Sequence, residues 1–456
     1  MNDNSVKSPG KGDRPSGKCK LRIGTVNVGT MSGRASEVVE MLTLRKVDVC
    51  CLQETRWRGG SARKIQGKDS VYKCFWCGNQ SGHGGVGVLI AEKWIDNVLS
   101  VVRHNHRCIQ IRFLVGTVIV NTICCYAPQT GLPTEEKDEF YDQVMSVIAS
   151  VPDDETLVLA GDMNGHVGEN SLGFEGVHGG NGFGNRNPDG LRLLDFCVAN
   201  QLAITNTFFN KSIPRLITFS SGGNETQIDY LLVRRSQLKW VKNVNVISSE
   251  ECISQHKLLV GDIILSSTPR APVRLPPRVK TWKLREEPIR AAFEESFKQK
   301  CGTVPEGVDD AWSHLRETLC DAAKEVCGST KGGCVRHKET WWWNDEVNNV
   351  ICEKRKAWKL WKSGGPKEDY LRAKRLAKSA VYIAKRDAQT EQFGDINNNS
   401  DKNRIFQLAK KLKRENADIV GEKCVRNDEG LLALTIDEKL KAWQAHYDKL
   451  LNEEFP

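Results

Sequence analysis

The sequence predicts an α/β fold: a four-layer α/β sandwich, in which two facing mixed β-sheets are flanked by helices, followed by a mainly α-helical tail. Short apolar runs rich in β-branched residues recur from residue 21 to about residue 265. Several of these runs are apolar on both faces, which requires covering layers on both sides of a sheet. After a stretch rich in proline and arginine, the apolar residues recur with a helical period.

Eight runs are expected to form strands, and three amphipathic stretches between them are expected to form helices. The strand candidates are LRIGTVNV (21–28), VDVCCLQ (47–53), GVGVLIA (85–91), CIQIRFLV (108–115), TVIVNTICCYA (117–127), TLVLAGD (156–162), QIDYLLV (227–233) and HKLLVGDIIL (256–265). The helix candidates span residues 35–45, 135–150 and 190–200. Two facing sheets with helices outside fit this order better than alternating βαβ units do.

These patterns divide the chain into four parts. Residues 1–20 are polar and are expected to form a disordered tail, and residues 21–266 form the sandwich. Residues 267–281 are a linker rich in proline and arginine, and residues 282–456 are a basic helical region. In that region the sequence GGP (364–366) separates two arms, 344–363 and 367–392, which predicts an antiparallel hairpin. Further helices are expected at 403–414 and 435–451.

Positive charge is concentrated in the hairpin. The whole chain has a net charge of +9, and residues 351–386 alone hold twelve Lys and Arg against three acidic residues. This density favours a polyanionic partner, DNA and possibly RNA, although a basic helix can also be a solvated face. No apolar stretch reaches the roughly 18 residues of a membrane helix, and no secretory signal precedes the sandwich. We therefore expect a protein of the nucleus or cytoplasm that is not secreted and has no membrane contact.

Polar residues stand where the buried strands begin or end, and they are candidates for one site. Each of them alone could be an ordinary turn or capping residue. In an α/β fold, however, catalytic groups converge at strand ends, so the set as a whole predicts a site. Its members are Asn27, Glu54, Tyr126, Asp162, Asn164, Asp229 and His256.

The residue types in this set suit metal-assisted hydrolysis of a phosphodiester. Glu54 and Asn27 offer the hard oxygen ligands that Mg²⁺ or Mn²⁺ prefers, and no Cys/His cluster competes for a softer metal. Asp162 with Asn164 could hold and deprotonate an attacking water. His256 paired with an aspartate could stabilise charge on a phosphoryl oxygen.

Six motifs in this order resemble those of the endonuclease/exonuclease/phosphatase superfamily. They are TVNVGTM, LQETRW, CCYAP, LAGDMNGHVG, QIDYLLV and SQHKLLV, within about residues 20–265. More narrowly, LQETRW, the segment NGFGNRNPDGLRLLDFCVANQLAITNTFF and ECISQHKLLV are similar to the endonuclease of RTE-type LINE (non-LTR) retrotransposons. In the tail, ETWWWNDEV and KRKAWKLW resemble the segment between endonuclease and reverse transcriptase in those elements. The resemblance implies a DNA endonuclease that uses Mg²⁺, with Mn²⁺ as an alternative ion.

The resemblance also assigns roles around the metal. Glu54 would be the main metal ligand, with Asn27 beside it. Asp162 would position and activate the water, and Asn164 would support it at the phosphate. The implied metal site consists of Glu54, Asn27, Asp162, Asn164 and His256.

The remaining roles concern the phosphate, and two positions depart from the superfamily pattern. Tyr126 would contact the phosphate, and Asp229 would orient His256 against the scissile group. Gly29 stands where abasic-site endonucleases of the superfamily often carry Asp. Gln255 replaces the Asp that usually precedes the final histidine, although RTE-type endonucleases look the same at this position. Because a carboxylate is lost, we expect one tightly held metal ion and reduced use of a second.

Basic and polar residues outside this set are candidates for nucleic-acid contact, and exposed charges that serve only solubility are the alternative. In the sandwich the candidates are Arg56, Arg58, Arg63, Arg215 and Thr218. In the hairpin they are Lys354, Arg355, Lys359, Arg372 and Arg375. The tryptophans near and within the hairpin recur at helical spacing, which favours a place in its core over base stacking.

The sequence thus leads to one expected function and two alternatives. The expected function is to nick target DNA and leave a 3′-hydroxyl that can serve as a primer, as in target-primed retrotransposition. The hairpin would add salt-sensitive affinity for nucleic acid, and nothing in the chain resembles a reverse transcriptase. The first alternative is a catalytically inactive, domesticated protein that binds nucleic acid or chromatin. The lesser alternative is a phosphoesterase acting on RNA or an inositol phosphate.

Overall fold

The computed structural model describes residues 18–247, 255–266, 278–303, 305, 307–329, 342–398, 406, 409–410, 412–413, 415–419, 421, 425–430, 432–433 and 436–452. The tail expected at 1–20, the linker expected at 267–281 and the helix expected at 403–414 lie largely outside the described residues. The chain divides into two compact units. One comprises Met1–Pro269 with Lys338–Pro456, and the other comprises Arg270–His337.

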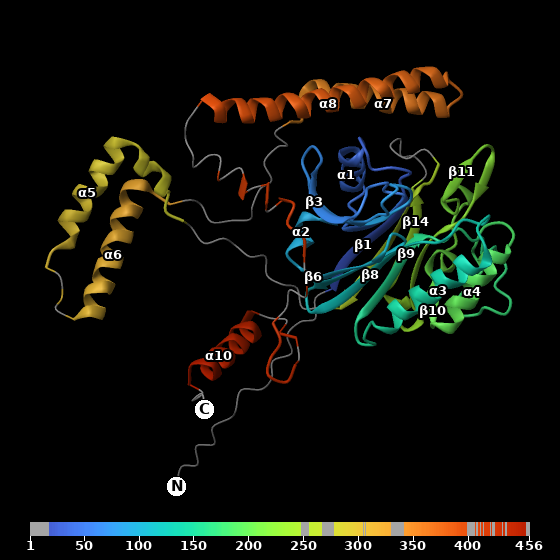
Figure 1. Ribbon diagram of the computed structural model, residues 1–456, viewed down its shortest axis with the longest axis horizontal. Helices are drawn as coiled ribbons and strands as arrows, with labels where there is room; N and C mark the ends of the chain where they lie inside the picture. Colours follow the sequence, from blue (N-terminus) through green and yellow to red (C-terminus); the bar gives the residue numbers. More distant parts are fainter. Residues whose placement is uncertain are drawn as a thin grey trace, which may run out of the picture. The chain divides into compact units, whose positions relative to one another are not determined.

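Two mixed β-sheets face each other in the first unit (Figure 1). The first sheet contains β1 (Lys18–Asn27), β2 (Val49–Gln53), β3 (Gly60–Gln66), β4 (Val71–Cys77), β5 (Val86–Ala91), β14 (Val241–Ile247) and β15 (Leu258–Ser266). Its strand order is β14-β15-β1-β2-β5-β4-β3. The second sheet contains β6 (Val98–Asn105), β7 (Cys108–Val115), β8 (Val118–Tyr126), β9 (Thr156–Asp162), β10 (Leu202–Ile204) and β13 (Asp229–Arg234). Its order is β10-β13-β9-β8-β7-β6, and β11 (Phe219–Ser221) pairs separately with β12 (Asn224–Thr226).

Helices cover the outer face of each sheet. The apolar face of α1 (Ala35–Leu44) packs on the first sheet, and those of α3 (Thr134–Ala149) and α4 (Pro188–Ala199) pack on the second. Between the sheets, side chains from both, such as Phe75 and Ile111, form the largest core. The short helices α2 (Glu92–Ile95), η1 (Thr205–Phe208), η2 (Ile213–Arg215) and η3 (Arg235–Trp240) connect strands. The predicted four-layer α/β sandwich is therefore confirmed.

Strand pairing brings polar strand ends to one edge of both sheets. β1 and β2 are parallel, so their last residues, Asn27 and Gln53, are register partners. β8 and β9 are also parallel, and Tyr126 is paired with Asp162. β13 runs antiparallel to β9, which places its first residue, Asp229, opposite Asp162. The carboxyl ends of four strands and the amino end of a fifth therefore meet.

The predicted hairpin is formed by α7 (Asp345–Lys362) and α8 (Lys367–Asn398), which pack against each other. Trp342 contributes to their shared core together with Val347, Ile351, Ala377, Val381 and Ala384. This confirms that a tryptophan of the WWW motif belongs to the hairpin core. The hairpin lies over α1 in the same compact unit (Figure 1).

The second compact unit is helical, as expected for the tail. It contains η4 (Thr281–Arg285), α5 (Glu287–Cys301) and α6 (Val308–Cys327), and α5 packs on α6 with an ion pair between Lys300 and Glu325 at 2.5 Å.

Near the end of the chain, α10 (Ile436–Asn452) occupies the predicted place of the last helix. None of the described helices has both the length and the apolar character needed to cross a membrane.

Candidate active site

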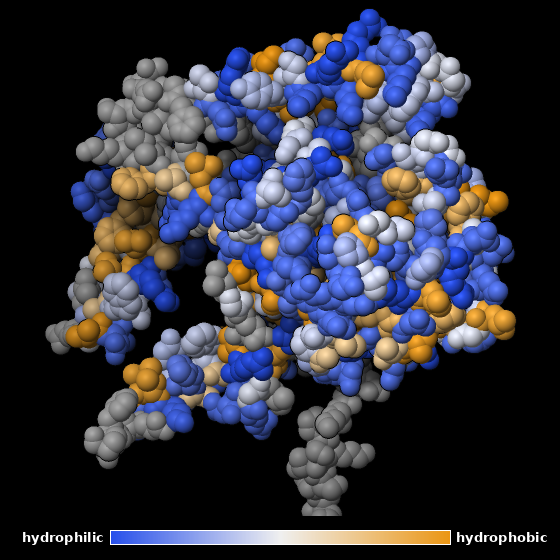
Figure 2. Space-filling model, turned by 45° about the vertical axis from the view of Figure 1, so that its right-hand side comes forward, coloured by the Kyte–Doolittle hydropathy of each residue, from blue (hydrophilic) through white to orange (hydrophobic). Residues whose placement is uncertain are grey.

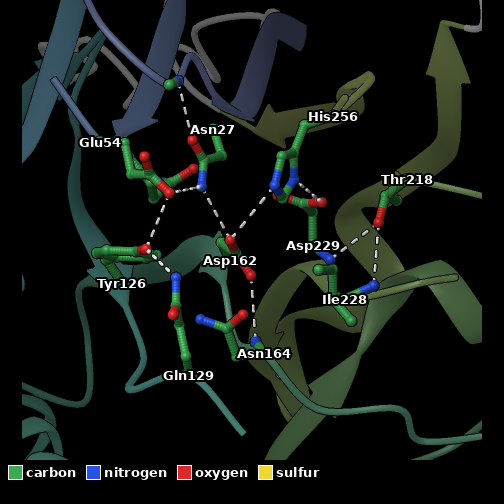
Figure 3. A network of polar contacts seen from close by, with 12 residues as sticks. Asn27, Glu54, Tyr126, Gln129, Asp162, Asn164, Thr218, Ile228, Asp229 and His256 are labelled. Atoms are coloured by element: carbon green, nitrogen blue, oxygen red, sulfur yellow. Dashed lines mark hydrogen bonds and ion pairs between the residues drawn. The ribbon is translucent and has the colours of Figure 1, made fainter. Parts of the chain in front are cut away.

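The polar strand-end residues form one network of contacts at the common edge of the sheets (Figure 3). Its seven members come from six different strand ends, so the network exists only in the folded chain. Its members are Asn27 (end of β1), Glu54 (after β2), Tyr126 (end of β8), Asp162 (end of β9), Asn164 (two residues further), Asp229 (start of β13) and His256 (before β15).

The side chain of Asn27 links two carboxylates from the two facing sheets. Its Nδ2 donates hydrogen bonds to Glu54 Oε1 and to Asp162 Oδ2, both at 3.1 Å. Its Oδ1 accepts the backbone N–H of Gly29 at 3.0 Å. Asn27 is 3% exposed, so these bonds are shielded from water. The amide therefore fixes the spacing between Glu54 and Asp162.

The carboxylate of Glu54 is held ionised by its donors. Besides Asn27, it accepts hydrogen bonds from the Tyr126 hydroxyl and from Arg56 Nη2, both at 3.0 Å. Burial alone would raise the pKa of Glu54, but the hydrogen bonds from Asn27, Arg56 and Tyr126 outweigh it and lower the pKa. Glu54 and Arg56 also adopt left-handed backbone conformations, with φ of 55° and 54°. Such conformations cost free energy in non-glycine residues and are typical of functional sites.

His256 lies between two aspartates. Its Nδ1 is 3.0 Å from Asp229 Oδ2, and its Nε2 is 3.7 Å from Asp162 Oδ2. Burial would lower the pKa of His256, but the charges of Asp229, Asp162 and Glu54 and the hydrogen bond to Asp229 raise it to about 9. The ring of Phe219 packs edge-on against the imidazole, with centroids 4.8 Å apart. The expected pairing of Asp229 with His256 is thus present, and the imidazole is a cation at neutral pH.

Asp162 has an increased affinity for a proton. Burial and the nearby charge of Asp229 raise its pKa, although His256 and the hydrogen bond from Asn27 act in the opposite direction. Asp162 Oδ1 accepts the backbone N–H of Asn164 at 3.1 Å. The arrangement gives the site a buried carboxylate that can act as a base near neutral pH.

Asn164 is held beside Asp162 by its backbone and its amide. The residue is left-handed, with a φ of 49°, and its Nδ2 donates to the carbonyl of Ala127 at 2.8 Å. The side chain is therefore fixed at the same strand ends as the base.

Thr218, which we expected to contact DNA, instead supports Asp229. Its side chain is fully buried, and its Oγ1 accepts the backbone N–H groups of Ile228 and Asp229, each at 3.0 Å. Its carbonyl accepts the N–H of Lys257, and the next residue, Phe219, forms a β-bridge with His256. A fully buried hydroxyl cannot reach DNA, so the prediction is wrong: Thr218 joins the Asp229 strand to the His256 segment.

The two residues that depart from the superfamily pattern, Gly29 and Gln255, each fit their local structure. Gly29 has a φ of +62°, a left-handed conformation that would be strained in an aspartate. Gln255 is exposed, and its Nε2 donates to Ser221 Oγ at 3.0 Å. Its carbonyl accepts the N–H of Ser220, so the segment before His256 is tied to β11.

A cavity of about 270 Å³ opens beside the network, and the sequence did not reveal most of its lining. Glu54 and Tyr126 form one wall, and His83, His106 and Arg107 contribute imidazole and guanidinium groups. The Arg107 guanidinium also lies 5.5 Å from the centre of the Tyr126 ring. The basic sequence RHNHR (103–107) could have indicated His106 and Arg107, whereas no signal in the sequence pointed to His83.

The remaining candidates for nucleic-acid contact differ in exposure. Lys354 is 3% exposed and forms an ion pair with Glu37 of α1, so it holds the hairpin and cannot serve as a surface contact as expected. Arg63 is half-buried, with its guanidinium 4.0 Å from the centre of the Trp57 ring, and Arg355 is also half-buried. The exposed candidates are Arg56, Arg58, Arg215, Lys359, Arg372 and Arg375.

Residues 24–248, most of the sandwich domain, match the model of the Endonuclease/Exonuclease/phosphatase family. Its members are usually hydrolases acting on phosphodiester bonds, and they generally use divalent metal ions. The chain is similar to craniofacial development protein 2 from Bos taurus, with 30% identity over 243 residues, covering 52% of this chain and 40% of that protein. The homologue from Tragulus javanicus is 30% identical over 260 residues, covering 55% and 44%. The chain thus spans less than half the length of these curated relatives.

Solved structures with similar chains include an AP endonuclease from Archaeoglobus fulgidus and the endonuclease domain of TRAS1, a telomere-specific non-LTR retrotransposon. The first is 17% identical, covers 53% of this chain and 98% of its own, and has a TM-score of 0.40. The second is 15% identical, covers 54% and 98%, and has a TM-score of 0.38.

The site residues fit a divalent cation. Asp162, Asp229 and His256 offer ligand atoms that all lie within 4.8 Å of one another, and Glu54 adds an ionised carboxylate. Among the described residues, Asp229 Oδ1 is a buried oxygen without a hydrogen-bond partner. Three carboxylates beside one imidazole carry net negative charge, which a bound cation would neutralise. Their hard oxygen donors favour Mg²⁺ or Mn²⁺.

Proposed function

We propose that this chain is a divalent-metal-dependent DNA endonuclease that nicks target DNA, as in target-primed retrotransposition. The observation that carries the proposal is the continuous set of contacts from Glu54 through Asn27, Asp162 and His256 to Asp229. In this proposal Glu54 is a ligand for the metal, Asp162 is the base and His256 is the cation, all at one edge of the sandwich. These are the groups that hydrolysis of a phosphodiester requires.

In this proposal Asp162 takes the proton of the attacking water. Its raised pKa makes it a stronger base than an ordinary aspartate. The water oxygen forms a bond to phosphorus, and the bond between phosphorus and O3′ breaks. The leaving oxygen takes up a proton and becomes a 3′-hydroxyl, while the phosphate remains on the 5′ end. Such a 3′-hydroxyl can serve as a primer.

His256 stabilises the negative charge that develops on the phosphoryl group. Asp229 accepts a hydrogen bond from Nδ1 and keeps the ring protonated. The other ring nitrogen is directed to the side of Asp162, where the substrate would lie. A fixed cation in a buried site stabilises such charge more strongly than water does. Tyr126 and Asn164 are placed to contact the same phosphate.

Glu54 and Asn27, with Asp162 and Asn164, would hold the metal ion. His256, which the resemblance also placed among the ligands, keeps its proton beside Asp229 and is assigned here to charge stabilisation alone, because a protonated imidazole has no lone pair for a metal. When bound, Mg²⁺ or Mn²⁺ supplies Lewis-acid stabilisation of the phosphoryl oxygens. Because Gly29 and Gln255 add no carboxylate, we propose that one ion is held tightly.

We also propose that the exposed cations of the hairpin bind the backbone of DNA, or of RNA, through charge. Lys359, Arg372 and Arg375 are the candidates that remain exposed there. Binding of this kind is independent of sequence and weakens steeply with salt.

Nicking of supercoiled plasmid DNA tests the proposal. With Mg²⁺, the wild type is expected to convert the plasmid to the open circle, and the isosteric Asp162→Asn variant is expected to be slower by about 10²-fold or more. A chelator is expected to stop the reaction. Equal, background-level nicking by wild type and Asp162→Asn, together with retained DNA binding, would establish the non-catalytic alternative instead. RNA and an inositol phosphate, supplied as separate substrates, distinguish the lesser alternative.

A further inference from the structure

The hairpin is docked on the catalytic sandwich through buried polar contacts. Lys354 of α7 pairs with Glu37 of α1, and its side chain is 3% exposed. Lys385 of α8 donates to Ser36 Oγ at 3.1 Å, and its Nζ lies 4.4 Å from the centre of the Trp342 ring. Buried polar groups retain their partners because an unpaired one is costly. These contacts hold the hairpin in one orientation on the catalytic sandwich.

The turn end of the hairpin lies beside the segment that carries the candidate catalytic histidine. Lys362 is the last residue of α7, and its charge acts on Lys257 more weakly than that of Glu225, whose carboxylate lies 4.0 Å from Lys257. Lys257 directly follows His256 in the chain. Cations are therefore present both in the segment next to the site and at the turn end of the hairpin.

A second group of cations gathers where α8 meets the loop that follows β1. The Cε atom of Lys378 lies 3.2 Å from the position that a Cβ on Gly33 would occupy. The charges of Arg34, Lys354 and Lys378 all act on the half-buried Lys374, and Glu37, the ion-pair partner of Lys354, acts in the opposite direction. Like charges this close repel one another, and a bound anion would relieve the repulsion. The loop that carries Gly33 begins right after Asn27, so this group also borders the site.

We propose that Lys257, Lys362, Lys374 and Lys378 form one surface that binds the phosphates of the DNA on one flank of the scissile bond. The hairpin is then a fixed extension of the active-site face, not an independently tethered binding module. Figure 2 shows hydrophilic residues gathered over the hairpin and over the sandwich below it. This inference rests on the proposed function, because it takes the scissile bond to lie at the Asp162 site.

Two triple variants of equal charge change test the surface. Lys362→Gln, Lys374→Gln and Lys378→Gln remove three cations from it. Arg235→Gln, Lys239→Gln and Lys242→Gln remove three exposed cations beyond the far end of β13, whose first residue is Asp229. Binding of the full chain to a duplex is measured as a function of salt. The first variant is expected to reduce the slope of log K against log salt by about 2 to 3, and the control by less than about 1.

Footprinting on a duplex with a single nick shows on which side of the nick the protein contacts the DNA backbone. Wild type and control are expected to protect the backbone further on one side of the nick than on the other. The first triple variant is expected to lose only that longer side. Lys362→Glu reverses the charge of one exposed residue of this surface. It is expected to act in the same direction and serves as the test where the triple variant folds poorly. Equal salt slopes for the two triple variants, or symmetric loss of protection, would overturn the inference.

The two proposals fail in different ways. If the wild type binds with the expected difference in slopes but does not nick, the surface stands as a binding surface and the proposed catalysis fails. If the wild type nicks and both triple variants bind alike, the catalysis stands and the surface fails.

Discussion

Asp162 and His256 face each other in the candidate active site, with 3.7 Å between Oδ2 of the carboxylate and Nε2 of the ring. The other ring nitrogen of His256 is hydrogen-bonded to Asp229. Two buried aspartates therefore share one imidazole, and the charges within this group alter the proton affinity of Asp162 and of His256. Asp162 is pushed toward the neutral form, whereas His256 is held in the charged form. These opposite shifts give the site a base and a cation.

The rate of nicking is expected to fall as the pH rises through about 9, the pKa of His256. The ordinary pKa is 6.5, so the folded protein keeps a proton that the unfolded chain has lost. The stability that this proton contributes is complete below pH 6.5 and disappears as pH rises through about 9. Asp229→Asn removes the main partner that holds the charge, and is expected to shift the loss of activity to lower pH.

The pH dependence of nicking and an NMR titration of the imidazole measure this shift. Glu225→Gln, a change at a carboxylate 4.0 Å from Lys257, serves as the control and is expected to leave the midpoint in place. An Asp229→Asn midpoint equal to that of the wild type would contradict the assigned pairing.

Asp162→Asn is expected to stabilise the metal-free protein while it removes activity. A raised pKa means that folding disfavours the ionised form, so stability falls as pH rises from 3.8, the ordinary value, through the raised one. Removing the charge should therefore add about 1 to 3 kcal/mol to the free energy of unfolding above the raised pKa, since one pKa unit is worth about 1.4 kcal/mol. Below pH 3.8 the gain should vanish.

Urea unfolding at several pH values, with a chelator present, measures the effect. A variant that is less stable than the wild type at every pH would show that Asp162 is a structural residue and not a strained base.

Thr218→Val is expected to lower both stability and turnover. The change removes the acceptor of two buried N–H groups, those of Ile228 and Asp229, and should cost about 1 to 3 kcal/mol. Because Asp229 would shift relative to His256, we expect kcat to fall while KM for the plasmid stays nearly constant. Thr218→Ser keeps the hydroxyl and should restore kcat. A loss of stability with unchanged kcat would mean that Thr218 does not position Asp229.

The apolar pattern of the sequence predicted inner strands well and edge strands poorly. The eight expected runs correspond to strands with a neighbour on each side, such as β8 and β9, which are buried on both faces. The four edge strands β3, β14, β10 and β6 were not expected, and neither was the inner strand β4. In β3, GSARKIQ, only Ala62 and Ile65 are buried, one on each face, because the strand lies at the edge of the sheet and only part of each face is covered. Such a strand has no apolar run to detect.

In the candidate site, some residues could be identified from their neighbours in the sequence, whereas the role of others depends on residues far away in the chain. Polar residues at the ends of apolar strands can be read from the sequence, and Asn27, Asp162 and His256 were found in this way. The ion pair of Lys354 joins residues 317 positions apart, and the buried hydroxyl of Thr218 serves a strand that begins 11 positions later. Nothing in the residues around Lys354 or Thr218 distinguishes them from surface contacts. Their burial depends on packing, which the sequence pattern does not report.

Gln255→Asp is expected to lower the concentration of Mg²⁺ that the nicking reaction requires. The change places a carboxylate next to His256, where the superfamily pattern usually has one, and adds negative charge to a site that already binds a cation in our proposal. The concentration of Mg²⁺ that gives half-maximal nicking should fall several-fold. Gln255→Asn, which shortens the side chain without adding charge, is the control. Equal Mg²⁺ midpoints for these two variants would show that residue 255 does not act on the metal.

The docking of the hairpin on α1 is expected to depend on the Lys354–Glu37 pair. Lys354→Met leaves the carboxylate of Glu37 mostly buried and unpaired, and should cost about 2 to 4 kcal/mol of unfolding free energy. Lys356→Met, at an exposed pair with Glu353 on the same helix, removes the same charge and should leave stability nearly unchanged.

Replacing both partners, with Glu37→Leu and Lys354→Met together, should recover most of the loss, because two apolar side chains can fill the space without a buried charge. Thermal unfolding monitored by circular dichroism measures all four proteins. If the hairpin is docked as the structure shows, Lys354→Met lowers the temperature at which the sandwich itself unfolds, since α1 is part of that domain. Equal unfolding temperatures for Lys354→Met and Lys356→Met would instead mean that the hairpin contributes nothing to the sandwich and that the two fold independently.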